Sequence, residues 1–209
     1  MKRINMAFVL MTVTISATLF LSAGGRQTVH ETSHDTEKAA RTPIPLILQE
    51  NEGDHLVHRA GPLGGVPFTI KVDGQFGNSE DFFVFAETLA PGQTIPFHKH
   101  DNAEQILVFE DPGATVIVGD KSGPAGAHSI VFIPRNTWFS ATNSAGKELH
   151  LLAIFSRNGF ENYMRAISAR PDEPLSPLSP DELTRSRGMG HAVYWDNSKG
   201  PYPPGVAHP

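Results

Sequence analysis

The middle of the chain is a series of short apolar runs separated by clusters of turn-forming residues. Glycine, proline, aspartate and asparagine interrupt the runs at short intervals, for example at Pro91-Gly92 and Asp111-Pro112-Gly113. Short strands with such interruptions are typical of a β-sandwich, a jelly roll or a barrel. Several runs are apolar on both faces, as expected where one face lines an interior and the other meets a second sheet or subunit. The runs lie at residues 68–72, 82–89, 105–109, 115–118, 129–133, 139–142 and 149–155.

After Phe155 the period of the pattern changes from that of a strand to that of a helix. Phe160, Tyr163, Met164 and Ile167 follow helical spacing, which predicts a helix that packs on the β-domain. A Pro-rich stretch follows, and Ser179 with Glu182 three residues later predicts the capped start of a second short helix. We therefore expect a core domain at 61–158, a helical extension at 159–190 and a tail at 191–209, with disorder from residue 197 onward.

The first residues have the three parts of a secretory leader. Lys2 and Arg3 precede an apolar run over 6–21, and small residues follow at 22–25. This order predicts a signal peptide at 1–24 and export to the periplasm or the medium, with a retained membrane anchor as the alternative. Residues 25–60 are expected to form a linker and edge strands. The chain has no cysteine, which excludes a lipid-modified cysteine, disulfides and thiolate ligands.

Composition and charge limit the classes of partner. With 209 residues and 39% hydrophobic content, the chain can bury one sizeable core. Its formal charge is -5 and no basic cluster appears in the mature part, so a nucleic acid or an anionic lipid surface is a poor match. A small-molecule ligand or substrate is the expected partner.

The candidate chemistry lies in the segment around residue 100. His98 and His100 are two residues apart, so on a strand their rings project to the same side. A turn at residues 101–102 would place Glu104 on a neighbouring strand within reach of both rings. Two histidines and one carboxylate make a site of the type that binds iron, manganese, nickel or zinc, and cobalt fits as well. His98, His100 and Glu104 are thus the predicted metal ligands, with iron the first expectation.

At these residues the sequence resembles the cupin superfamily. The first cupin motif, Gly, five residues, His-x-His, three or four residues and Glu, matches at Gly92, His98, His100 and Glu104. The second motif aligns with residues 134–143, where Asn136 replaces the usual glycine of the turn. Phe139 stands where the fourth ligand histidine is usual. Asparagine tolerates the positive φ that the turn requires, whereas a phenyl ring cannot bind a metal.

The resemblance covers about residues 67–156. The order of the strands, the two motifs and the helix that follows also resembles that of single-domain cupins similar to quercetin 2,3-dioxygenases. It implies an all-β fold, the double-stranded β-helix or cupin jelly roll, with the predicted C-terminal helical extension. It also implies a homodimer that forms through the sheets. Because the fourth ligand is absent, three interpretations of the site stay open: an iron-type site with a free coordination position, a weak metal site completed by another group, and a metal-free polar cluster.

Strand alternation suggests which side chains surround the site. Ile106 and Val108 share the side of Glu104 and would line the cavity together with Phe139, while Gln105 would face away. Such a pocket favours a partly aromatic or enol-bearing molecule. His128 and His150 are expected to be surface histidines, whereas His30, His34, His55 and His58 show no ligand spacing, so none of these residues is a predicted ligand.

Two functions remain open at this stage. The first is a metal-dependent oxidoreductase of the dioxygenase type, for which no separate catalytic base is identifiable. The second is a non-catalytic small-molecule-binding protein with a degenerate metal site.

Overall fold

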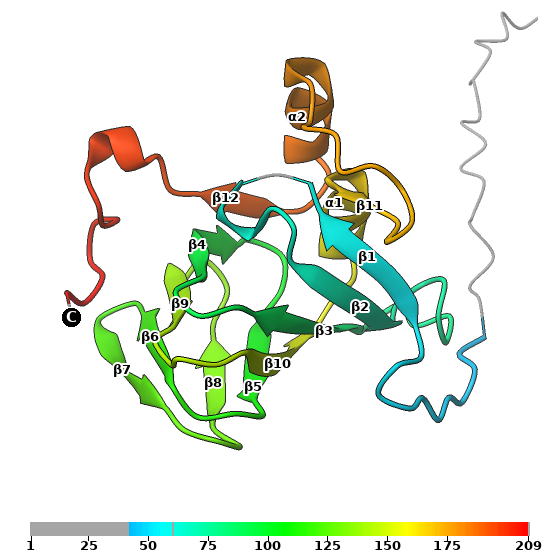
Figure 1. Cartoon of the computed structure of the whole chain (residues 1–209), viewed down its shortest axis with the longest axis horizontal. Helices are drawn as coiled ribbons and strands as arrows, with labels where there is room; N and C mark the ends of the chain where they lie inside the picture. Colours follow the sequence, from blue (N-terminus) through cyan, green and yellow to red (C-terminus); the bar gives the residue numbers. More distant parts are fainter. Residues whose placement is uncertain (1–41, 60, 209) are drawn as a thin grey trace, which may run out of the picture. The chain divides into compact units, whose positions relative to one another are not determined.

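The computed structural model describes residues 42–59 and 61–208, and most of its regular structure is β-strand. The predicted signal peptide at 1–24 and the first part of the predicted linker lie outside the described residues. Within the described part, no helix is long and apolar enough to cross a membrane. Figure 1 shows the strands in two groups, with the two α-helices at one end of the larger sheet.

The strands form two antiparallel sheets. The larger sheet has seven strands in the order β11-β1-β2-β3-β10-β5-β8, and the smaller has five in the order β12-β4-β9-β6-β7. The strands of the larger sheet are β1 (Asp54–His58), β2 (Pro67–Val72), β3 (Phe83–Leu89), β5 (Gln105–Phe109), β8 (Ile130–Ile133), β10 (Leu149–Phe155) and β11 (Ser168–Ala169). Those of the smaller sheet are β4 (Thr94–His100), β6 (Ala114–Val118), β7 (Lys121–Ala125), β9 (Phe139–Asn143) and β12 (Ala192–Tyr194).

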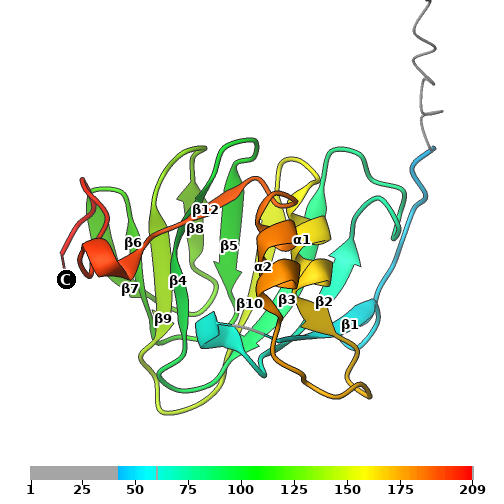
Figure 2. The ribbon, with the colours of Figure 1, turned by 90° about the horizontal axis from the view of Figure 1, so that it is seen from above.

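The eight strands from β3 to β10 have the topology of a jelly roll. The four-strand set β3-β10-β5-β8 belongs to one sheet and the set β4-β9-β6-β7 to the other. Apart from the β6–β7 hairpin, each connection along the chain from β3 to β10 crosses from one sheet to the other (Figure 2). This double Greek-key connectivity confirms the predicted all-β, double-stranded β-helix fold.

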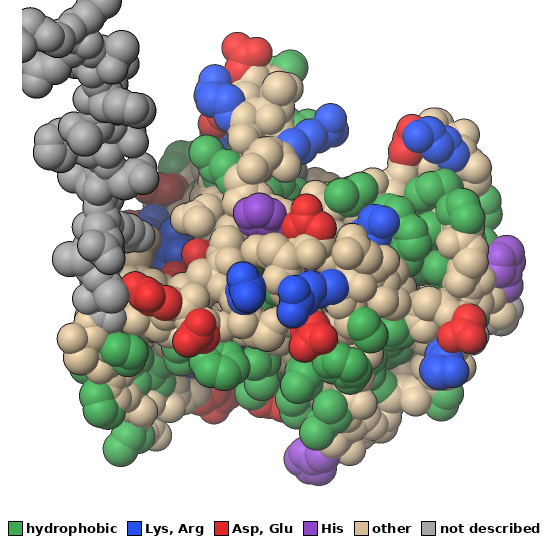
Figure 3. Space-filling view, turned by 180° about the vertical axis from the view of Figure 1, so that it is seen from behind, with side chains coloured by type: hydrophobic (Ala, Val, Ile, Leu, Met, Phe, Trp, Pro, Cys, Tyr) green, Lys and Arg blue, Asp and Glu red, His purple; other side chains and the backbone are tan. Residues whose placement is uncertain are grey.

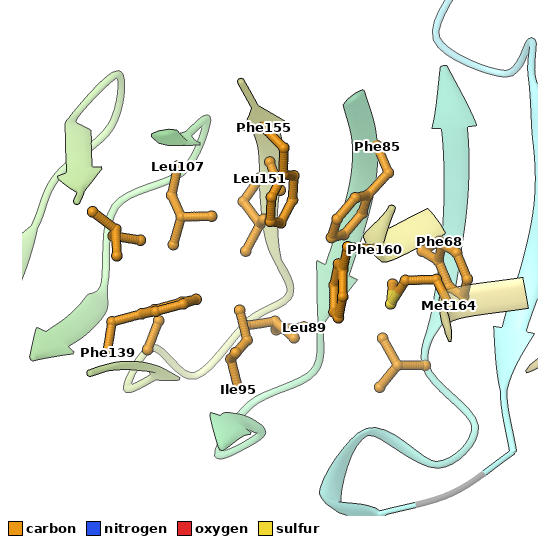
Figure 4. Close-up of a cluster of buried hydrophobic side chains, with 14 of the residues drawn as sticks. Phe68, Phe85, Leu89, Ile95, Leu107, Phe139, Leu151, Phe155, Phe160 and Met164 are labelled. Carbon is orange, nitrogen blue, oxygen red and sulfur yellow. The ribbon is translucent and has the colours of Figure 1, made fainter. Parts of the chain in front are cut away.

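The space between the two sheets is filled by aromatic and aliphatic side chains. Leu107 and Leu151 of the larger sheet approach Phe139 and Ile95 of the smaller sheet, and Phe85 and Phe155 continue the layer toward the helices (Figure 4). Phe139, Phe155 and Leu107 are fully buried. At about 25 cal/mol per Å² of apolar surface removed from water, this layer is the main source of stability of the fold.

Two helices cover one end of the barrel. In α1 (Phe160–Ala166) the side chains of Phe160, Tyr163 and Met164 are buried, as the helical spacing predicts. Helix α2 (Pro180–Arg187) begins with the expected capping box, because Ser179 and Glu182 each accept a hydrogen bond from the other's backbone N–H. Two short 3-10 turns, η1 (Gly61–Leu63) and η2 (Asn197–Lys199), complete the regular structure.

The tail differs from the prediction of disorder after residue 197. η2 is ordered, Val206 is buried, and the backbone N–H of Ala207 donates to the carbonyl of Gly119. Just before it, β12 pairs with β4 in register Tyr194 to His98. The tail is held against the smaller sheet, because Tyr202 packs on Phe97 of β4 with ring centroids 5.9 Å apart. The preceding strand β12 satisfies backbone hydrogen-bonding groups at the edge of β4.

The two faces of β5 are opposite to those that strand alternation suggested. Ile106 and Val108 are partly exposed on the outer face, whereas Leu107 and Phe109 are fully buried. The pairing with β10 explains the orientation: Leu107 lies opposite Ala153 and Phe109 opposite Leu151, and cross-strand partners share a face. Because both faces of β5 are apolar, the sequence of this strand alone does not identify the inner one.

The turn at Asn136 has the predicted conformation, and charges of both signs occur on the surface. Asn136 has a φ of 59°, the left-handed conformation that its place in the glycine position requires. On the face shown in Figure 3, acidic and basic side chains are interspersed and hydrophobic ones gather between and below them. No single-sign charge field dominates that face.

Candidate functional site

A cavity of about 350 Å³ lies between the sheets at the end covered by the helices. Its wall comes from both sheets, from α1 and from the segment of β12. Most of the lining side chains are apolar or aromatic, and the polar ones are few. The apolar part includes Leu63, Phe85, Ile95, Leu107, Phe139, Leu151, Ala153, Phe160, Met164 and Ile167, and the polar part includes His58, Glu87, His98, Gln105, Tyr163, Tyr194 and Asn197.

His98 contributes a neutral imidazole to this wall. Its Nδ1 lies 2.8 Å from the carbonyl oxygen of Pro96, and since a carbonyl can only accept, Nδ1 carries the proton. The lone pair is therefore on Nε2. Burial lowers the pKa of His98 to about 4, although the bond to Pro96 opposes this shift. At neutral pH His98 is an uncharged ring with one nitrogen available to a ligand or a metal.

His100 lies beside His98 at the next inward-facing position of β4. The two ring centroids are 5.0 Å apart, and His100 is only 3% exposed. Burial, followed by repulsion from His98, lowers the pKa of His100 to about 2, while the nearby backbone carbonyl of His191 opposes the shift. Neither ring nitrogen makes a hydrogen bond of ordinary geometry to a described residue. Such unsatisfied buried nitrogens are what a bound group would be expected to satisfy.

Glu104 does not complete a three-ligand site with the two histidines. It precedes β5 on the partly exposed side of the chain, and its backbone N–H donates to Ser156 Oγ. Among the described residues, no three His, Asp or Glu side chains come together in an arrangement that could hold a metal. The predicted set of His98, His100 and Glu104 is therefore not assembled here, because the outward register of Glu104 follows from the inward register of Leu107 and Phe109.

Gln105 occupies the position that Glu104 was expected to fill. It is 4% exposed, lines the cavity, and its Oε1 has no hydrogen-bond partner among the described residues. An amide oxygen can accept a hydrogen bond or bind a metal, but it carries no charge to neutralise a cation. Gln105 was expected to face away from the site, and the pairing of β5 with β10 reverses that expectation.

The other predicted pocket residues divide between the two faces of the barrel wall. Phe139 lies in the cavity wall, with its ring centroid 4.2 Å from that of His98. Ile106 and Val108 do not line this cavity. They lie on the outer face of the sheet, where Val108 is opposite Ile130 and Ile106 opposite Phe132.

The cavity contains a second polar group, the His58–Glu87 pair, which the sequence analysis did not predict. Nε2 of His58, on β1, lies 2.8 Å from Oε1 of Glu87, on β3, and both side chains are 3% exposed. The ring of His58 also packs on Phe68 with centroids 4.5 Å apart. The available signal was the alternation in β1, since Leu56 and His58 project to the same side and Leu56 is a core residue.

Two tyrosines close the cavity beside His98. The ring of Tyr194 stacks on that of His98 with centroids 5.1 Å apart, and Tyr163 packs against Tyr194. Tyr194 is 38% exposed as a whole residue, but its hydroxyl end is enclosed, and this desolvation raises its pKa well above the usual value. The neighbouring Tyr163 and Glu87 act in the same direction. Both phenols therefore remain hydrogen-bond donors at any physiological pH.

Comparison with known proteins yields similarity in solved structures only. Neither a known protein-family profile nor a curated protein sequence matches the chain. An oxalate decarboxylase from Lactobacillus farciminis, solved as a formate complex, is 18% identical with a TM-score of 0.41, over 44% of this chain and 29% of the other. The match thus spans less than a third of that enzyme.

Two further solved structures show similarity of the same order. A predicted oxalate decarboxylase from Thermotoga maritima is 20% identical with a TM-score of 0.46, over 54% of this chain and all of the other. The cupin domain of Cnp3 from Schizosaccharomyces pombe is 15% identical with a TM-score of 0.40, over 51% of this chain and 75% of the other. At these values the similarity identifies no activity for this chain, and the fold assignment rests on the strand topology described above.

Proposed function

We propose that this protein binds a small, partly aromatic molecule inside its β-barrel. The observation that carries the proposal is the cavity of about 350 Å³, which has mainly apolar walls and a few polar groups among them. A cavity of this size and composition is typical of a small-molecule site. The hydrophobic walls would supply affinity, and His98, Gln105 and the His58–Glu87 pair would orient the ligand.

The charge of the lining side chains limits the class of ligand. No lysine or arginine is among the described residues that line the cavity, and Glu87 is an acidic group within it. A strongly anionic ligand would therefore lose its hydration without gaining an ion pair. An uncharged ring compound with hydroxyl or carbonyl groups matches the cavity better.

A cavity-filling variant tests the proposal. Ala153 lines the cavity from β10, whereas Ala86 lies on the outer face of β3 in the same sheet. We expect phenols, catechols and flavonols to raise the thermal unfolding temperature of the wild type and of A86L, and to leave that of A153L unchanged. Stabilisation of A153L equal to that of the wild type would place binding elsewhere and refute the proposal.

A second candidate function is a metal-dependent oxidoreductase of the dioxygenase type acting on the same kind of molecule. It is favoured by the unsatisfied nitrogens of His100, the free Nε2 of His98 and the unsatisfied Oε1 of Gln105. These groups would hold a divalent transition metal, with iron the first expectation and manganese, nickel, cobalt or zinc as alternatives. Such a metal would act as a Lewis acid or redox centre, while the chain would orient the substrate and exclude water.

Metal analysis of natively purified protein tests this second function. If His98, His100 and Gln105 hold the metal, H98A and Q105L should each reduce the amount of bound metal, whereas E104Q should leave it unchanged. Metal loss in E104Q equal to that in H98A would restore the His-His-Glu ligand set. Absence of any bound transition metal, together with no affinity for added metal, would leave small-molecule binding alone.

We further propose that the chain is exported and forms a homodimer. Export rests on the leader expected at 1–24, and cell fractionation tests it directly. The homodimer is supported by the outer face of the larger sheet, where Ile130 is 69% and Phe132 54% exposed next to Ile106 and Val108. Contiguous exposed apolar side chains of this kind are typical of an interaction surface.

A further inference from the structure

The His58–Glu87 pair joins two strands that are not neighbours in the sheet. β2 lies between β1 and β3, and Phe68 of β2 is opposite both Leu56 of β1 and Glu87 of β3. The two polar side chains meet over this strand, on the inner face, at an Nε2 to Oε1 distance of 2.8 Å. Both line the cavity, so the pair forms a polar group in a wall that is otherwise mainly apolar.

The hydrogen bond determines which nitrogen of His58 is available. A carboxylate can only accept a hydrogen bond, so Nε2 of His58 carries a proton and donates the hydrogen bond to Glu87. In the neutral ring the lone pair is then on Nδ1, and Nδ1 makes no hydrogen bond to a described residue. A carboxylate that holds one nitrogen of an imidazole orients the ring and stabilises the imidazolium formed when the other nitrogen accepts a proton.

His98 cannot take this role equally well. Its Nδ1 donates to the Pro96 carbonyl, which is uncharged, and no carboxylate of a described residue is paired with the ring. The cavity therefore contains two unlike imidazoles: one that remains a neutral acceptor and one with a negative charge behind it. Only the second is arranged to accept a proton.

We propose that His58, held by Glu87, accepts the proton of an acidic hydroxyl, a phenol or an enol, on the molecule that the cavity binds. The O–H bond of the ligand breaks, a bond forms between the proton and Nδ1, and the electron pair stays on the ligand oxygen. His58 becomes an imidazolium between two negative charges, and no oxidant or further reactant is needed. Glu87 is a positioning residue, because it acts through His58.

The identity of the ligand class follows from the walls and the pair together. A group that is already anionic would be repelled by Glu87, whereas a neutral hydroxyl meets the free Nδ1 as a donor. The mainly apolar lining of the cavity, to which Phe85 and Leu151 belong, favours a ring as the rest of the molecule. This inference rests on the proposed binding function and goes beyond it by stating where the ligand loses a proton.

Two probes distinguish failure of the inference from failure of the binding function. 4-Nitrophenol absorbs at longer wavelength once it has lost its proton, whereas 4-nitroanisole has nearly the same shape and no proton to lose. Both are titrated into the full chain after EDTA treatment, so that no metal acidifies the phenol, at a pH below the pKa of free 4-nitrophenol. We expect both probes to bind, and the bound 4-nitrophenol to have a phenolate-to-phenol ratio at least tenfold higher than the free compound.

Variants of His58 and Glu87 test whether this pair causes the increase in phenolate. H58F should still bind 4-nitroanisole and should remove the increase in phenolate, and E87Q should reduce it at least tenfold. The matched controls are H150F and D111N, since His150 and Asp111 form a histidine–carboxylate pair at 2.6 Å on the exposed surface. Both controls should retain the wild-type spectrum.

The possible outcomes separate failure of the proton-transfer inference from failure of the binding proposal. Binding of 4-nitrophenol without additional phenolate, or an H58F spectrum equal to that of the wild type, would overturn the inference and leave the binding function intact. If neither probe binds, both proposals fail for this class of ligand. If H58F does not fold, H58Q and E87Q are tested by the same phenolate-to-phenol ratio. A His58–Glu87 pair with only a structural role would leave that ratio unchanged in both variants.

Discussion

The two faces of β5 have similar composition and different surroundings. Leu107 and Phe109 are fully buried in the barrel, while Ile106 and Val108, equally apolar, remain partly exposed on the outer side. The difference arises from the partners, because β10 places Leu151 and Ala153 opposite the inward residues. An apolar side chain is thus assigned to the core or to a surface by its cross-strand neighbours, and the same one-residue choice brings Gln105 rather than Glu104 into the cavity.

The largest expected effect is a decrease in the free energy of unfolding at low pH, which buried histidines cause and exposed ones do not. In the unfolded chain His98 and His100 have the ordinary pKa of 6.5, whereas in the fold the values are about 4 and about 2. Below pH 6.5 the unfolded chain therefore binds protons that the folded chain does not, and stability decreases as pH falls. At pH 4.5 the loss should be on the order of 5 kcal/mol for the metal-free protein.

Urea unfolding at a series of pH values measures this loss. The double variant H98Q/H100L should show a smaller decrease in the free energy of unfolding between pH 7 and pH 4.5. H150Q, which changes an exposed histidine, should follow the wild-type curve. Identical curves for the wild type and H98Q/H100L would show that the two rings are not buried as neutral groups.

The next effect compares the two faces of β5 directly. L107A removes a fully buried side chain, and we expect it to lower the free energy of unfolding by about 2–5 kcal/mol through lost burial and the cavity left behind. I106A, on the partly exposed outer face, should cost about 1 kcal/mol or less. Denaturant titration of both variants is the measurement, and a larger cost for I106A would mean that the inner face of β5 has been assigned incorrectly.

A smaller effect compares the two histidine–carboxylate pairs. E87L leaves His58 buried without its hydrogen-bond partner, and we expect a loss of about 1–3 kcal/mol in the free energy of unfolding. H150L, which breaks the exposed pair with Asp111 and leaves the backbone N–H of residue 150 as a donor to that carboxylate, should cause no measurable change, because exposed ion pairs contribute little. Equal losses in the two variants would contradict the distinction between a buried and a solvated pair.

The smallest effect on folding is expected on the outer face. The double variant I130S/F132S should leave the free energy of unfolding nearly unchanged, since both side chains are more than half exposed. If the outer face is the dimer surface, sedimentation or size-exclusion measurements should nevertheless show a monomer where the wild type is a dimer. A wild type that is monomeric at all concentrations would refute the homodimer proposal.

The sequence was sufficient for the fold and for part of the site. The spacing of strands and turns, the helix beginning at Phe160 and the cap at Ser179 follow from local patterns, and the structure confirms them. His98 and His100 lie side by side because two residues on one strand share a face, which is also a local rule. Each of these predictions depends on residues close together in the chain.

The remaining features depend on pairing over long distances, and the sequence does not reveal them. The inner face of β5 is decided by β10, and the meeting of His58 with Glu87 is decided by the packing of β1, β2 and β3. Tyr194 reaches His98 only because β12 joins the edge of β4. A strand that is apolar on both faces, or a tail that looks polar, contains no local signal for such partners.

The pairing of β12 with β4 also determines when the cavity becomes complete during translation. His98 is synthesised long before Tyr194, Trp195 and Asn197, which supply the last part of the wall. A polypeptide that ends before residue 192 would lack Tyr194 and Trp195 in the cavity wall around His98. The full wall of the cavity is therefore present only in chains that extend to Asn197.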